Sequence, residues 1–182
     1  MIERETIKPS SPTPQNHRIH NFCLLDQISP AYWIPLLLFF AKNTDLINTS
    51  ERSQLLKKSL SQTFTRFYTF AGRLRDNVAI ECNDEGAEFV VARVHCSLSA
   101  ILENPDPATL TSLAPSEALP KEALFTSPLL MVKASFFDCG GMAIGLCLSH
   151  KAGDAATLST FFNSWAAATT KSELEPALVP EF

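Results

Sequence analysis

The sequence predicts an α/β fold in which a mixed β-sheet is flanked by helices. Two apolar runs, residues 129–137 and 142–148, have the length of strands, and the turn-forming residues 138–141 separate them. The second run carries no polar side chain, as expected of an internal strand covered on both faces. A helical pattern follows it after a short turn, so the order strand, turn, helix is predicted at this place.

Two segments show the spacing of amphipathic helices. In residues 48–70 the recurring apolar positions are Leu55, Leu56, Leu60, Phe64 and Phe67. After Asp154 they are Leu158, Phe161, Phe162, Trp165 and Ala166. Asn48 with Glu51 three residues later resembles a capping box, although Ser50 could equally be the cap of the first helix.

The remaining segments are interpreted from turn residues and prolines. Residues 79–82 and 87–94 are strand-like, and the polar residues 83–86 between them predict a hairpin. Residues 104–122 contain four prolines, so we expect a surface loop. Residues 34–40 are continuously apolar, which favours a buried strand or the floor of a cleft.

Composition excludes several classes of partner. The 182 residues suit one domain, and 15 basic side chains scattered among 19 acidic ones form no stripe for nucleic acid or anionic lipid. No apolar run reaches the roughly 20 residues of a membrane span, and the N-terminus lacks the apolar core of a signal peptide. We therefore expect a cytoplasmic protein whose five cysteines are reduced and buried. His17 and His20 lack a third ligand nearby, so no metal site is predicted.

His150 and Asp154 form the main candidate for chemistry. A histidine on a strand-to-helix turn is held rigidly at a sheet edge, where ligands commonly bind in α/β folds. Imidazole titrates near working pH, so it can take a proton from a bound hydroxyl group and release it again. The spacing also fits a purely structural interpretation, in which Asp154 caps the next helix and His150 is a hydrogen-bonded core residue.

Four blocks in the same order resemble the BAHD family of acyl-CoA-dependent acyltransferases. Residues 130–154 are similar to the family's stretch ending in the His-x-x-x-Asp motif. The earlier blocks are residues 24–27, residues 56–61 continuing through 67–74, and residues 80–86. Ala155 departs from the commoner glycine after the aspartate, as it does in members acting on alkaloids or terpenoids. Ordered blocks over nearly the whole chain are more specific than one motif.

The resemblance implies the N-terminal lobe of the chloramphenicol-acetyltransferase-like fold over residues 1–170. Residues 171–182 would begin the crossover linker to a C-terminal lobe that is missing, together with its Asp-Phe-Gly-Trp-Gly motif. The resemblance further implies that His150 is the general base and that Asp154 supports the motif structurally. Acyl-CoA would be the co-substrate, no cofactor would be tightly bound, and the complete enzyme would be a monomer.

By the same resemblance, Trp33, Ile34, Leu36 and Leu38 would line part of the acceptor pocket, although a plain core role also fits them. Apolar side chains there favour a small apolar alcohol, or an amine, among plant specialised metabolites. This chain alone is expected to be inactive. An alternative is a non-catalytic truncated homologue that binds a ligand or partner, and a further one is a thioesterase that uses water as acceptor.

Overall fold

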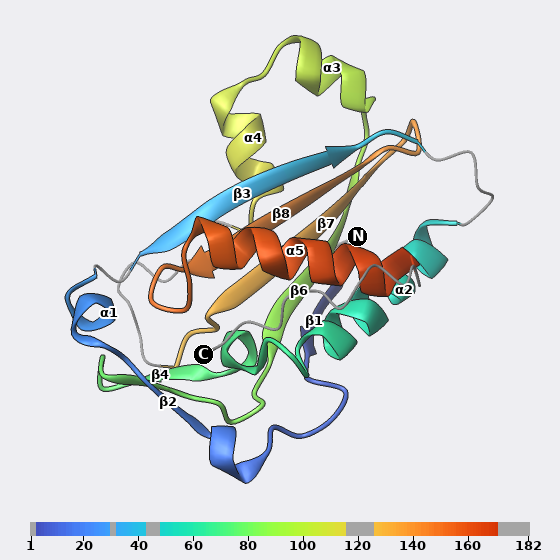
Figure 1. Cartoon of the computed structure of the whole chain (residues 1–182). Coiled ribbons are helices and arrows are strands. Elements are labelled where there is room, and N and C mark those ends of the chain that lie inside the picture. The colour runs from blue at the N-terminus through green and yellow to red at the C-terminus, as the bar shows by residue number, and fades with distance from the viewer. Residues whose placement is uncertain (1–2, 30–31, 43–47, 116–125, 171–182) are drawn as a thin grey trace.

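The computed structural model describes residues 3–29, 32–42, 48–115 and 126–170. Its centre is a five-stranded sheet in the order β1-β6-β7-β8-β3, beside a three-stranded sheet in the order β2-β5-β4 (Figure 1). The large sheet consists of β1 (Glu3–Ile7), β3 (Trp33–Phe40), β6 (Ala87–Val94), β7 (Leu130–Phe137) and β8 (Met142–Ser149). The small sheet consists of β2 (Ile19–Asn21), β4 (Arg73–Arg75) and β5 (Ala79–Glu81). Only β6 and β7 pair in parallel, so the large sheet is mixed, as predicted.

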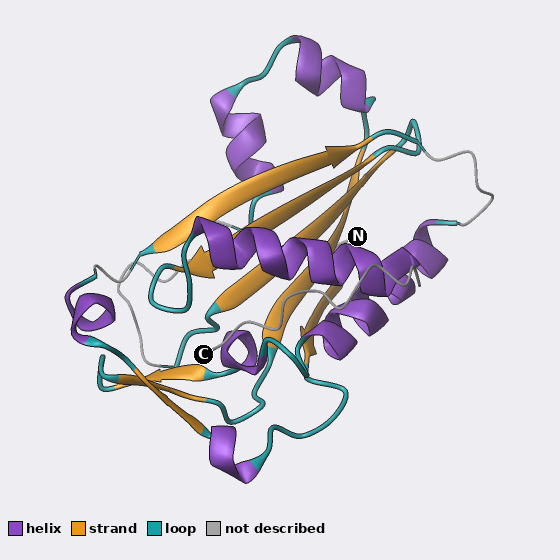
Figure 2. Cartoon of the chain, viewed as in Figure 1, coloured by secondary structure: helices purple, strands orange, loops and turns teal. Residues whose placement is uncertain are grey.

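Helices cover both faces of the large sheet, which confirms the predicted α/β class (Figure 2). The α-helices are α1 (Leu24–Ile28), α2 (Thr49–Thr63), α3 (Leu98–Glu103), α4 (Pro107–Leu113) and α5 (Ala155–Thr170). Two short 3-10 helices are η1 (Gln15–His17) and η2 (Tyr68–Ala71). The helices α2 and α5 lie across one face (Figure 1), and the apolar side chains of α3 and α4 pack against the other.

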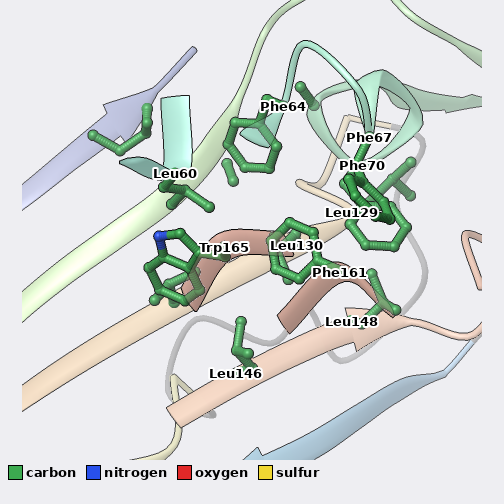
Figure 3. Close-up of a cluster of buried hydrophobic side chains, with 14 of the residues drawn as sticks. Leu60, Phe64, Phe67, Phe70, Leu129, Leu130, Leu146, Leu148, Phe161 and Trp165 are labelled. Atoms are coloured by element: carbon green, nitrogen blue, oxygen red, sulfur yellow. The ribbon is translucent and has the colours of Figure 1, made fainter. Parts of the chain in front are cut away.

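The main core lies between the large sheet and the pair α2 and α5 (Figure 3). Alternate residues of β8, from Met142 to Leu148, belong to this core, whereas Ala143 belongs to the smaller core under α3 and α4. Trp165 ties the two helices together, because its indole nitrogen donates to the Leu56 carbonyl at 3.2 Å and to the Ser59 hydroxyl at 3.0 Å. The prediction of an internal strand followed by a packed helix is therefore confirmed.

The first predicted helix begins as expected but ends early. Asn48 Oδ1 accepts from the Glu51 amide at 2.9 Å in a capping box, so Asn48 is the cap and Ser50 is not. The helix ends at Thr63 rather than at residue 70. Beyond it, three fully buried phenylalanines pack around Phe161 of α5, with ring centroids 5.1 to 6.3 Å from that of Phe161. These are Phe64, Phe67 and Phe70.

The predicted hairpin of residues 79–82 and 87–94 is wrong. The strand β5 pairs with β2 and β4, whereas β6 pairs with β1 and β7, so the two strands belong to different sheets. The turn between them is held by the N-terminal segment instead. Asp84 accepts hydrogen bonds from Thr13 at 3.1 and 2.6 Å and pairs with Arg18 at 2.9 Å.

The proline-rich segment 104–122 is only partly a loop. Asp106 caps α4 by accepting from the Thr109 amide at 2.8 Å, and Pro107 occupies the first helical position, where the absence of its N–H costs nothing. The part from 116 to 122 lies outside the described residues. The expectation of a loop is therefore wrong for α4.

The apolar segment 34–40 does form a strand, β3, but the expectation of burial is wrong. It pairs only with β8 and is half-buried to exposed along its length, which suits Pro35 because an edge strand tolerates a residue without an amide hydrogen. The expectation about cysteines is also wrong in part: Cys82 and Cys147 are buried, but Cys23 and Cys139 are exposed. Within the described ranges, none of the helices is both long and apolar enough to cross a membrane.

Gly145 in β8 generates a test of how closely α4 approaches the sheet. A Cβ atom at this position would collide with the Leu113 carbonyl oxygen and lie 2.9 Å from Ala114 Cα. Both are backbone atoms, so α4 would have to move. Gly145→Ala should therefore lower the free energy of unfolding by about 1–3 kcal/mol in urea titrations. Gly141→Ala is the control, since its nearest contact is a Leu98 side-chain carbon at 3.1 Å, and an equal loss in both variants would contradict this packing.

Candidate functional site

The turn that carries His150 is fixed by three backbone hydrogen bonds. The Ser149 amide donates to the Leu129 carbonyl, the His150 amide to the Tyr32 carbonyl, and the Ala152 amide to the Ser149 carbonyl, each at 2.8 Å. Two of these bonds reach segments distant in sequence, so the turn is anchored on both sides of β8. The backbone of His150 is therefore held between the start of β7 and the start of β3.

The imidazole of His150 is half-buried and faces an exposed aromatic ring. Its centroid lies 5.0 Å from that of Tyr32, with the planes tilted by 59°. Within the described parts of the chain, neither ring nitrogen has a hydrogen-bond partner. This arrangement leaves a nitrogen lone pair able to accept a proton from an incoming group, which a sealed core histidine could not do.

Asp154 is the N-cap of α5. Its Oδ1 accepts from both the amide and the hydroxyl of Thr157, each at 2.8 Å, and its carbonyl accepts from the Leu158 amide at 2.9 Å. These bonds to Thr157 hold the pKa of the Asp154 carboxyl below its usual value, because they favour the ionised form. The carboxylate thus has a defined structural task at the start of the helix.

Lys151, which no local pattern in the sequence marks, follows His150 in the same turn and is only 5% exposed. Its ammonium donates to the carbonyl oxygens of Asp26 at 2.7 Å and Gln27 at 2.9 Å, and it lies 5.9 Å from the centre of the Phe22 ring. Burial lowers the pKa of Lys151, while the carboxylate of Asp26 opposes that shift. The only sequence signal was that residues 24–27 and 130–154 both belong to the blocks shared with one family.

The helix that Lys151 binds presents an apolar surface to solvent. Leu24, Leu25 and Ile28 of α1 are 72%, 73% and 70% exposed, and no residue of this helix is buried. Tyr32, the ring neighbour of His150, is exposed as well. Such a group of large exposed apolar side chains is typical of a surface that contacts a ligand or another protein part.

The structure brings only some of the predicted acceptor residues to His150. Trp33 pairs with Ser149 and Ile34 with Leu148, so both lie at the His150 end of the sheet. Leu36 packs against the main core, and Leu38 pairs with Ile144. Leu38 is five positions along β3 from Trp33, so their Cα atoms lie about 17 Å apart.

The face of β3 also divides these residues. Alternation along the strand places Ile34, Leu36 and Leu38 on the side of the main core and Trp33 on the other. The Trp33 indole donates to the Pro128 carbonyl at 3.3 Å. A groove of about 810 Å³ opens at the far end of β8, lined among others by Phe40 and Met142, and His150 does not line it.

The two histidines weighed as metal ligands lie in elements other than the turn that carries His150, although the His20 ring lies 6.2 Å from that of Phe22. His17 is in η1, where its Nδ1 is 3.3 Å from the Tyr68 hydroxyl, and His20 is in β2. Among the described residues, no cluster of three or more His, Cys, Asp or Glu side chains could hold a metal ion.

Comparison with known proteins identifies relatives over the full length of the chain. A family model described as "Transferase family" matches residues 1–182. Stemmadenine O-acetyltransferase of Catharanthus roseus is 42% identical, and the match covers 92% of this chain and 41% of the length of that protein. Salutaridinol 7-O-acetyltransferase of Papaver somniferum is 39% identical, and the match covers 100% of this chain and 41% of the length of that protein. The chain therefore spans about two-fifths of the length of these relatives.

Solved structures agree with the sequence relatives. The crystal structure of vinorine synthase superposes with a TM-score of 0.89 at 37% identity, covering 100% of this chain and 45% of that chain. F. sporotrichioides TRI101, complexed with coenzyme A and T-2, gives a TM-score of 0.66 at 14% identity, over 86% of this chain and 42% of that one. The second likeness shows a shared fold.

Capping by Asp154 predicts a pH-dependent contribution to stability. Asp154→Ala should lower the free energy of unfolding by about 1 kcal/mol, because alanine cannot accept the Thr157 amide, whereas Asp154→Asn should lose less. The pKa of the Asp154 carboxyl is lowered in the folded state. The stability advantage of the carboxylate over asparagine should therefore be complete above the pKa of the unfolded chain, about 3.9. It should disappear as the pH falls through the folded pKa. Urea unfolding from pH 7 downward measures this, and a pH-independent difference between wild type and Asp154→Asn would contradict it.

Proposed function

Because the chain belongs to the BAHD acyltransferases of the Transferase family, we propose that it forms the N-terminal lobe of an acyl-CoA-dependent O-acyltransferase with His150 as general base. Residues 1–170 would be the lobe; the proposed start of the linker to a second lobe, residues 171–182, lies outside the described residues. The observation that carries the proposal is the half-buried imidazole at the end of β8, which has no hydrogen-bond partner among the described residues.

The proposed reaction needs one proton acceptor at position 150. A ring nitrogen of His150 takes the proton of the acceptor hydroxyl as its oxygen attacks the thioester carbonyl carbon. The tetrahedral intermediate then collapses, the carbon–sulfur bond breaks, and the CoA thiolate leaves with the proton that the imidazolium returns. The thioester is already activated, so the chemistry requires neither a metal ion nor a covalent acyl-enzyme. Acyl-CoA serves as co-substrate, and coenzyme A is named in the TRI101 complex of the same fold.

The acceptor is proposed to be a small apolar alcohol. The relatives are named as O-acetyltransferases of stemmadenine and of salutaridinol, and the surface near His150 is rich in apolar side chains. Tyr32 lies against the imidazole, and Trp33 and Ile34 lie at the same end of the sheet. Leu24, Leu25 and Ile28 are exposed on α1, the helix whose carbonyls Lys151 binds.

A second lobe is proposed to cover this surface. The matched part is about two-fifths of the relatives' length, and the exposed apolar side chains of α1 would be buried against a second lobe. We propose that the complete enzyme is a cytoplasmic monomer that binds neither nucleic acid nor membranes.

The decisive experiment compares the chain alone with a chimera in which it is continued by the C-terminal part of Rauvolfia serpentina vinorine synthase. The chimera is expected to form esters from acetyl-CoA and a panel of alkaloid and terpenoid alcohols, detected by mass spectrometry, while the chain alone is not. His150→Ala should lower kcat of the chimera by about 10²–10⁴-fold, the usual contribution of a general base. His95→Gln, an exposed histidine that pairs with Asp138 at 3.4 Å, is the matched control and should retain full activity.

Other outcomes separate the alternatives. Undiminished ester formation by the His150→Ala chimera would show that His150 is not the general base. Release of CoA without any alcohol would indicate a thioesterase. A folded chimera that binds acceptor alcohols but transfers no acyl group would favour the non-catalytic binding module. Thermal unfolding by circular dichroism verifies that each variant is folded.

A further inference from the structure

A buried ammonium next to the proposed base is an unusual feature of this fold. Lysine is rarely buried, because its charge must find compensating partners away from water. Lys151 obtains them from two backbone carbonyls, those of Asp26 and Gln27, at 2.7 and 2.9 Å. These are charge-assisted hydrogen bonds, which are stronger than hydrogen bonds between neutral groups. Its neighbour in sequence, His150, is the residue that the proposed reaction uses.

The helix bound by Lys151 has little else to hold it in place. It has five residues, far fewer than an isolated helix needs to persist in water. None of its residues is buried, so apolar packing does not attach it. Two further bonds are local: the Gln27 side-chain nitrogen donates to the Phe22 carbonyl and the Cys23 amide to the Asp26 carboxylate, each at 3.0 Å. Towards the rest of the fold, the Phe22 amide donates to the Val78 carbonyl at 2.8 Å, and the Asn77 side chain donates to the Gln27 carbonyl at 3.3 Å.

His150, the residue before Lys151, binds the chain shortly after α1. The His150 amide donates to the Tyr32 carbonyl at 2.8 Å, and the two rings lie against each other. Trp33 then pairs with Ser149 as β3 begins. Residues 22–29 are thus attached to the turn through Lys151, and residues 32–33 through His150 and Ser149.

We propose that Lys151 is a positioning residue for the base: its ammonium fastens α1 to the turn that carries His150, so that this turn, and with it the imidazole beside Tyr32, keeps its place. This inference rests on the proposed role of His150. The positive charge sits at the carbonyl end of α1, where a helix favours cations. A neutral side chain of the same length would fill the space without holding the carbonyls.

The first test uses the chain itself and measures amide hydrogen exchange. Lys151→Met should raise exchange about tenfold or more in residues 22–29 and 149–153, because the two charge-assisted bonds are lost and these segments open locally. Lys151→Arg should recover most of the protection. Lys133→Met is the matched control, since the Lys133 ammonium also binds one backbone carbonyl, that of Ser112 at 2.6 Å, at an exposed position.

Exchange within about twofold of wild type in Lys151→Met would overturn the inference, since tenfold corresponds to loss of roughly one such bond. If Lys151→Met does not fold, Lys151→Gln, which is shorter and uncharged, is measured in its place. Its amide exchange should also rise about tenfold or more, and exchange within about twofold of wild type would overturn the inference.

The second test uses the acyl-transferring chimera and separates positioning from mere stability. Lys151→Met should lower kcat by about 10²-fold with a smaller change in KM for the alcohol, as a misplaced catalytic group does. Lys151→Arg should restore most of kcat. Unchanged kcat in a variant whose α1 exchanges freely would overturn the inference, whereas activity retained by His150→Ala would count against the proposed base and leave the exchange result standing.

Discussion

Burial of β8 between two apolar layers determines where residue 150 lies. Alternate side chains of this strand pack under α5 and under α4, and its two neighbours, β3 and β7, pair along its length. A strand held on both faces and both edges cannot shift its register without moving an apolar side chain to the wrong layer. The turn at the end of β8 is therefore fixed in position. Asp154 caps the next helix only four residues after His150.

Local sequence signals predicted the elements whose stabilising contacts are themselves local. The capping box of Asn48 and Glu51 and the strand, turn and helix from residue 142 onward all follow from short-range patterns. The hairpin prediction was wrong because the turn near Asp84 is held by Thr13 and Arg18, more than sixty residues away. No local pattern reveals that two adjacent strands belong to different sheets.

The same distinction applies to the site. His150 and Asp154 stood out because their spacing and the order of the surrounding blocks are visible in the sequence, although their catalytic roles are still proposals. Lys151 did not stand out, because its partners are backbone carbonyls 124 and 125 residues away. Every residue has a carbonyl oxygen, so side-chain identity does not indicate which one a lysine will bind. Only the folded arrangement shows that α1 and the turn are joined.

The attachment of α1 through its main chain leaves its side chains free to vary. Neither hydrogen bond from Lys151 depends on the identity of residue 24, 25 or 28, whose side chains face solvent. Substitutions at these three positions can therefore alter the shape and polarity of the exposed surface of α1 while the helix keeps its place. The side chains of this helix can thus diverge without disturbing the backbone bonds that hold residue 150.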